Sequence, residues 1–123
     1  IRQAVDYGTA RIGHGVNCIH DKNLMNIIAE KGITLELCPT SNLNTKIVND
    51  IKDYPIDKII NNKIKVTINT DNMTVSGTDE ASEMKLICDT FGYDGNMRRI
   101  FVDNAIDAAF LSNEMKEKLR GNL

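Results

Sequence analysis

The chain has 123 residues, of which 41% are hydrophobic and 26% are charged, so it is long enough and apolar enough to form one domain around a core. Fifteen lysine and arginine residues against seventeen aspartate and glutamate residues give a net charge of −2, with no basic run. This balance argues against nucleic-acid binding. No apolar stretch approaches the roughly 20 residues that span a bilayer, so we expect no membrane partner.

The cysteines and the first residue bear on the cellular location and on the completeness of the sequence. Cys18, Cys38 and Cys88 are odd in number, widely spaced and without a CxxC motif, which favours reduced thiols in a cytoplasmic protein. The sequence opens on Ile1 rather than on methionine, in what resembles the end of an amphipathic helix. We therefore expect a fragment of a longer protein.

The predicted elements alternate between short strands and helices. After an opening helix that runs into a turn at Gly8, alternating apolar and polar residues predict strands over residues 10–14, 33–38 and 64–69. Apolar residues spaced three to four apart, together with capping residues, predict helices over residues 22–31, 46–51, 55–62, 79–91, 96–111 and 114–119. Residues 40–44 and 74–77 are expected to be loops, and Thr78 is expected to cap the helix that follows it.

This alternation of strand and helix is typical of an α/β fold with parallel strands. In the third strand Ile64, Val66 and Ile68 share one face, and the other face is polar. A flat doubly wound sheet buries both faces of its strands, whereas a barrel can keep a polar inner face near an active site. A complete barrel of this kind takes about 250 residues. We therefore expect residues 1–123 to form a single partial domain, either part of a (β/α)8 TIM barrel or an unusual small open sheet.

Polar residues follow each predicted strand. They are His14 after the first strand, the segment over 38–42 after the second, and Asp71 with Asn72 after the third. Because the carboxyl ends of parallel strands meet at one rim, we expect these groups to lie together. Each also has a simpler structural explanation, such as a turn, or for Asp71 a cap on the following loop. The glycines on both sides of His14 indicate an unusual backbone there, and the occurrence of histidine and aspartate at equivalent strand ends favours a functional site.

Three segments resemble, in order and spacing, the last three strands of the adenosine deaminase family. They read RIGHG over 11–15, ELCPTSN over 36–42 and INTD over 68–71. Asn104-Ala105 and Phe110-Leu111 resemble the closing pairs of the same family, so the resemblance covers essentially the whole chain. It implies the last three strands of a zinc-dependent (β/α)8 barrel of the amidohydrolase superfamily, followed by its C-terminal helices.

The resemblance implies a role for three residues. Asp71 matches the aspartate that ligates Zn2+ and orients the attacking water. His14 matches the catalytic histidine that contacts this water and stabilises the charge of the transition state. Asn72 stands where the family usually has a second aspartate that hydrogen-bonds purine N7, and an amide NH2 can donate that bond. Gly13 before His14 is typical of the adenosine branch rather than of the adenine branch.

The activity that the resemblance implies is hydrolysis of adenosine or 2′-deoxyadenosine to inosine or 2′-deoxyinosine and ammonia, with a purine nucleoside as small-molecule partner. Deamination of adenine or of a modified adenosine is the alternative within the superfamily, and a non-catalytic purine-binding or structural βα module is the alternative outside it. The other zinc ligands and the proton-shuttling glutamate of the family are not found among these residues. Because catalytic zinc needs three protein ligands and a water, we expect the chain alone neither to hold Zn2+ nor to deaminate.

Three strands taken from a barrel would leave two open edges, at the strands that start near Ala10 and near Ile64. Such edges carry unpaired N–H and C=O groups that can pair with another chain. Thr34, Glu36 and Thr67 on the inner face would also be bare. We therefore expect the isolated chain to associate through its edges, with a copy of itself or with the rest of the parent protein. A marginally stable monomer is the alternative.

Overall fold

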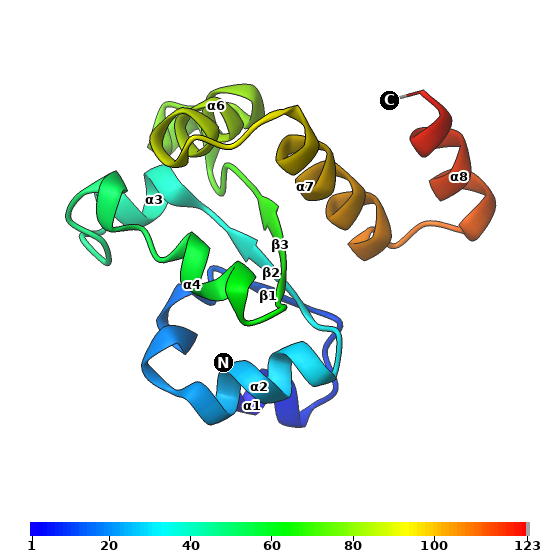
Figure 1. Ribbon diagram of the computed structural model, residues 1–123, viewed down its shortest axis with the longest axis horizontal. Coiled ribbons are helices and arrows are strands. Elements are labelled where there is room, and N and C mark those ends of the chain that lie inside the picture. The colour runs from blue at the N-terminus through cyan, green and yellow to red at the C-terminus, as the bar shows by residue number, and fades with distance from the viewer. Residues whose placement is uncertain (123) are drawn as a thin grey trace.

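The computed structural model describes residues 1–122 and contains a three-stranded parallel sheet with helices around it (Figure 1). The strands are β1 (Arg11–Gly13), β2 (Thr34–Leu37) and β3 (Lys65–Ile68), in the order β1-β2-β3. Both neighbouring pairs are parallel. The prediction of three adjacent parallel strands is confirmed, and each strand begins one residue later and ends one residue earlier than predicted.

The helices connect the strands and complete the chain after β3. Aspartate or serine side chains cap several of them, because these short side chains accept hydrogen bonds from free N–H groups of the first turn. The α-helices are α1 (Arg2–Asp6), α2 (Lys22–Glu30), α3 (Pro39–Asn44), α4 (Ile56–Asn61), α5 (Met73–Ser76), α6 (Glu80–Phe91), α7 (Gly95–Ala108) and α8 (Asn113–Gly121). Two 3-10 helices, η1 (Val16–His20) and η2 (Ile51–Asp53), precede α2 and α4. Within the described residues, no helix has the length and apolar character that crossing a membrane requires.

The segments on either side of β3 differ from the prediction. Residues 40–44, expected as a loop, belong to α3, because Pro39 takes the first helical position, where no N–H is needed. Residues 46–50, expected as helix, form turns and bends after Lys46, whose φ of 57° is left-handed. Residues 74–76 belong to the short α5 rather than to a loop. The cap of α6 is Asp79, not Thr78, since the Asp79 side chain accepts from Ser82 N–H.

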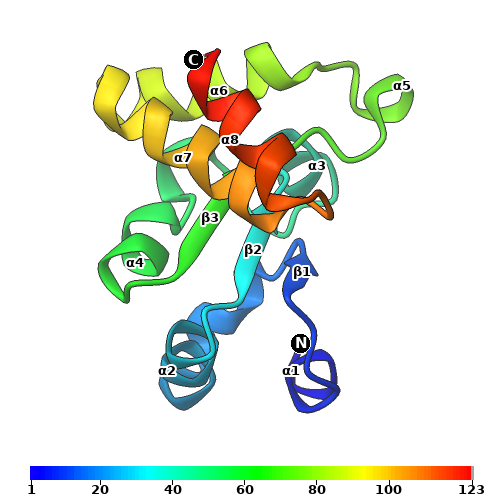
Figure 2. The same cartoon turned by 90° about the vertical axis from the view of Figure 1, so that its right-hand side faces the viewer.

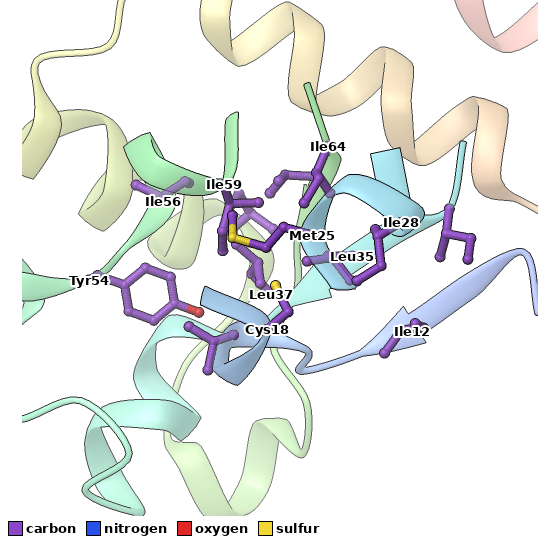
Figure 3. Close-up of a cluster of buried hydrophobic side chains, with 14 of the residues drawn as sticks. Ile12, Cys18, Met25, Ile28, Leu35, Leu37, Tyr54, Ile56, Ile59 and Ile64 are labelled. Carbon is purple, nitrogen blue, oxygen red and sulfur yellow. The ribbon is translucent and has the colours of Figure 1, made fainter. Parts of the chain in front are cut away.

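One face of the sheet forms the core with α2 and α4. The strand residues on this face are paired across the sheet, and they are Ile12, Leu35, Val66, Leu37 and Ile68. Figure 3 shows Met25 and Ile28 of α2 and Ile59 of α4 packed in the same cluster as Leu35 and Leu37. Burial of such apolar side chains is the main source of folding free energy. The two-residue alternation in the sequence therefore placed this layer correctly.

The sequence predicted that the opposite face of the sheet would be bare, and this prediction is wrong. Thr34 and Thr67 are only 4% and 3% exposed, and Glu36 is half-buried beside Arg11, with 3.3 Å between Arg11 Nε and Glu36 Oε1. The Arg11 guanidinium in turn lies 4.0 Å from the ring centre of Phe110, which follows α7. The segment after α7 therefore contacts the first residue of β1. The alternation of apolar and polar residues along the strands could not predict this contact.

The free edge of β3 is partly covered as well. Figure 2 shows α7 beside β3 and α8 next to α7. Asn69 N–H donates to Leu37 C=O, so in the parallel ladder residues 65, 67 and 69 bond to β2 and the Val66 carbonyl points to the other side. Asn104 Nδ2 of α7 donates to this carbonyl over 2.9 Å. Among the described residues, β1 has no strand partner besides β2.

Candidate functional site

The carboxyl ends of β1 and β3 bring His14 and Asp71 together. His14 directly follows β1, and Asp71 is the third residue after β3. The distance between His14 Nε2 and Asp71 Oδ2 is 3.6 Å, and the two side chains are 45% and 44% exposed. The two candidate residues therefore lie on the same side of the sheet, as predicted, and both are accessible to a ligand.

Left-handed backbone conformations make this approach possible. His14 has a φ of 65° and Asp71 a φ of 60°. Such conformations cost non-glycine residues of order 1–3 kcal/mol each and cluster at functional sites. Strand alternation alone would send His14 to the same face as the buried Ile12, and the left-handed turn redirects it to the rim. Glycine is favoured at position 15, because its φ of 52° strains any other residue and a Cβ there would lie 2.8 Å from Leu35 Cδ2.

Residues after β2 hold Asp71 in place. Ser41 Oγ, in α3, donates to Asp71 Oδ2 over 3.0 Å. No described residue hydrogen-bonds to Asp71 Oδ1, so this oxygen is free to bind a ligand. The sequence pointed to the segment over 38–42 as a whole, but it did not indicate that Ser41 is the residue in contact with Asp71.

The Cys38 thiol is not itself a reactive group. Burial, followed by the negative charges of Asp71, Glu83 and Glu36, raises the pKa of Cys38 to about 11. The side chain is only 5% exposed. Since the thiolate rather than the thiol is the nucleophile and metal ligand, Cys38 contributes packing and not chemistry.

Asn72 caps the segment after β3, a role that the sequence had suggested for Asp71. Its Oδ1 accepts the Val75 N–H over 3.0 Å and so caps α5. The simpler explanation of Asp71 as the cap of this segment is therefore wrong. The Nδ2 group of Asn72 remains as a donor on an exposed side chain.

The site fits part of a metal centre. Among residues 1–122, no three His, Cys, Asp or Glu side chains converge on a common point that could hold a metal ion. Asp71 offers a free carboxylate oxygen, which is a usual zinc ligand, but catalytic zinc takes three protein ligands. The donor set of these residues is thus compatible with one ligand of such a centre and does not complete it.

Two further polar side chains near the site were missed by the sequence analysis. Glu83 of α6 is 1% exposed, and its Oε2 accepts the Thr40 N–H over 3.1 Å. Asn42 of α3 is fully buried, and its Oδ1 accepts from the Tyr54 hydroxyl over 2.7 Å. Nothing in the local sequence distinguishes Glu83 from the exposed Glu80 of the same helix, so only the tertiary fold reveals its position.

The comparisons with known proteins cover all or nearly all of the chain. The family model described as adenosine deaminase matches residues 1–123. An adenosine deaminase from Clostridium perfringens is 41% identical over 122 residues, which are 98% of this chain and 36% of the relative. The chain therefore spans about a third of the length of the curated relatives that it matches.

Solved structures share the same arrangement of strands and helices. An adenine deaminase from Arthrobacter aurescens superimposes with a TM-score of 0.91 at 22% identity, over 96% of this chain and 36% of the other. An amidohydrolase from Burkholderia ambifaria with bound zinc has a TM-score of 0.85 at 24% identity, over 98% of this chain and 34% of the other. The fold is thus that of the corresponding third of an amidohydrolase TIM barrel.

Proposed function

The chain belongs to the adenosine deaminase family, and on this premise we propose that the full-length protein hydrolyses adenosine or 2′-deoxyadenosine to inosine or 2′-deoxyinosine and ammonia. The observation that carries the proposal is the 3.6 Å approach of His14 Nε2 to Asp71 Oδ2, at the ligand-binding end of the strands. It occurs in a chain whose whole length matches the family.

Asp71 and His14 are the residues of this chain that would act on the reacting atoms. We assign Asp71 Oδ1 to the metal, because Oδ2 is already held by Ser41 and faces His14. From that position Oδ2 can orient the attacking water. His14 Nε2 can donate a hydrogen bond to the oxygen on which negative charge develops, and preorganised donors of this kind stabilise the transition state strongly.

Zinc is the metal that we propose for the complete site. The bound zinc of the Burkholderia ambifaria amidohydrolase supports this choice. When bound, zinc lowers the pKa of a coordinated water to near 7. Since residues 1–122 contribute one plausible ligand, we propose that this chain alone neither retains catalytic zinc nor deaminates.

Asn72 is the residue that we assign to the substrate. Its Oδ1 is engaged at α5, whereas its Nδ2 can donate to a ring nitrogen of the purine such as N7. Adenine or a modified adenosine is the alternative substrate, and the likeness of the fold to an adenine deaminase keeps adenine as the main competitor. The ratio of kcat/KM for adenosine and adenine separates these two.

The edge of β1 is the surface that we propose for association with the rest of the barrel. β1 pairs only with β2 among the described residues, whereas the outer edge of β3 is contacted by Asn104. An exposed strand edge is a template for pairing. We also propose a cytoplasmic location, since Cys18, Cys38 and Cys88 are free and buried.

The test of the proposed function uses the purified full-length protein. With zinc bound, it should convert adenosine to inosine and ammonia in equal amounts, lose this activity on dialysis against a chelator, and regain it with zinc. Zinc-loaded protein that binds adenosine without producing ammonia would overturn the enzymatic proposal in favour of a purine-binding protein. A higher kcat/KM for adenine than for adenosine would make adenine the substrate in place of adenosine.

A further inference from the structure

The side chain of Glu83 is in an environment that normally disfavours a carboxylate. It is 1% exposed, its Oε1 has no hydrogen-bond partner, and no ion pair joins it to a cation among the described residues. Burying an unpaired carboxylate is costly. An apolar or amide side chain would fill the same space at lower cost, so the presence of a glutamate calls for an explanation other than packing.

Among residues 1–122, the one group that hydrogen-bonds to the Glu83 side chain is a backbone N–H of α3. Its Oε2 accepts the Thr40 N–H over 3.1 Å. Thr40 is the second residue of α3, where N–H groups have no acceptor within the helix. Glu83 therefore supplies, from a different helix, the acceptor that the first turn of α3 lacks. The Tyr54 hydroxyl holds the same helix further along, through Asn42 Oδ1.

The first turn of α3 in turn determines the orientation of Asp71. Ser41 is adjacent to Thr40, is 8% exposed, and donates through Oγ to Asp71 Oδ2 over 3.0 Å. The same Oδ2 faces His14 Nε2 at 3.6 Å. Ser41 thus selects which carboxylate oxygen turns towards His14 and which remains free.

We propose that Glu83 is a positioning residue for Asp71, acting through the Thr40 N–H and the Ser41 hydroxyl. The inference rests on the proposed function, because it assigns Glu83 a part in orienting the residue that would bind zinc. Partners that orient metal ligands typically change metal affinity or activity by 10- to 100-fold when they are removed. Glu83 differs from the usual case in being two hydrogen bonds away from the ligand.

Two substitutions of equal size separate positioning from packing. Glu83→Gln keeps an oxygen that can accept the Thr40 N–H, whereas Glu83→Met fills a similar volume without an acceptor. Glu80→Met, on the exposed start of the same helix, is the matched control. Each variant is made in the full-length protein, and the zinc dissociation constant, kcat, KM and hydrogen exchange of the Thr40 amide are measured.

The proposal predicts that Glu83→Met weakens zinc binding and lowers kcat by about 10- to 100-fold, and that Glu83→Gln stays within about threefold of the wild type in both. KM should change little in either variant, and the Thr40 amide should exchange faster only in Glu83→Met. Because Glu83 acts through Ser41, adding Glu83→Met to Ser41→Ala should lower kcat no further than about threefold.

Three results would overturn the inference. They are wild-type zinc affinity and kcat in Glu83→Met, equal losses in Glu83→Met and Glu83→Gln, and losses that add fully to those of Ser41→Ala. A wild-type protein that neither binds zinc nor deaminates would overturn the proposed function and this inference together. If Glu83→Met does not fold, rapid exchange of the Thr40 amide in Glu83→Gln would also overturn it.

Discussion

The core layer and the rim of the sheet are built by different rules. In the layer under α2 and α4, each strand residue lies where two-residue alternation places it, and Ile28, Leu35 and Ile59 are fully buried. At the rim, His14 and Asp71 depart from this alternation through left-handed backbone and remain nearly half exposed. The comparison indicates that burial in the core supplies the folding free energy that offsets the backbone strain of the exposed rim. Substitutions in the two regions should therefore have separable effects.

The largest effect is expected at Asp71. In the full-length protein, Asp71→Ala should abolish deamination and reduce bound zinc, because it removes a metal ligand. Zinc content by atomic absorption and ammonia release check this. Asp6→Ala is the matched control, since Asp6 is an exposed residue of α1 and lies outside the proposed site. Wild-type turnover and zinc content in Asp71→Ala would show that Asp71 is not a zinc ligand and that the proposed site is wrong.

A core substitution should show the opposite pattern. Ile28→Ala in α2 removes a fully buried side chain and should lower the free energy of unfolding by about 2–5 kcal/mol. Its kcat per folded molecule should remain that of the wild type, because Ile28 does not reach the rim. Urea denaturation and steady-state kinetics measure the two quantities, with the exposed Glu30→Ala as control. A large loss of kcat in folded Ile28→Ala would show that core substitutions affect catalysis as well as stability, and the effects of the two regions would not be separable.

His14→Ala separates the catalytic role proposed for His14 from the metal-binding role proposed for Asp71. Zinc should stay bound, while kcat falls by about 10²–10³-fold, as on removal of one donor to a developing oxyanion. His20→Ala, which removes an exposed histidine from η1, should leave both quantities unchanged. Loss of zinc in His14→Ala would instead make His14 a metal ligand.

The sequence predicts the features of this structure that depend on neighbouring residues, and it misses those that depend on contacts between distant segments. Alternation located the three strands to within one residue at each end, and the polar strand ends pointed to His14 and Asp71. The helix over 39–44 was missed although Pro39 at its first position is a local signal, and its second stabilising feature, the acceptor that Glu83 of α6 gives to the Thr40 N–H, is not visible in the local sequence. Likewise, the apolar spacing over 96–111 did not indicate which apolar side chains of α7 are buried, and Phe101 is 2% exposed whereas Ile100 is 50% exposed. Such features depend on contacts between segments far apart in the sequence.

The smallest effect is expected at Asn72. Asn72→Ala should raise KM by about 2- to 10-fold, the loss of one hydrogen bond to the substrate, and should leave zinc bound. The same change removes the cap of α5. Asn72→Asp keeps an acceptor for the Val75 N–H and serves as the control for that structural loss. An unchanged KM in Asn72→Ala would remove Asn72 from the substrate site.

We propose that Asp71 at the rim binds zinc and that His14 lies beside the metal without coordinating it. Anomalous diffraction at the zinc edge from crystals of the full-length, zinc-loaded protein tests it most directly. We expect a zinc ion about 2.0–2.2 Å from Asp71 Oδ1, with His14 beside the site but not coordinated to the metal. A zinc ion bound elsewhere, with Asp71 uncoordinated, would contradict it.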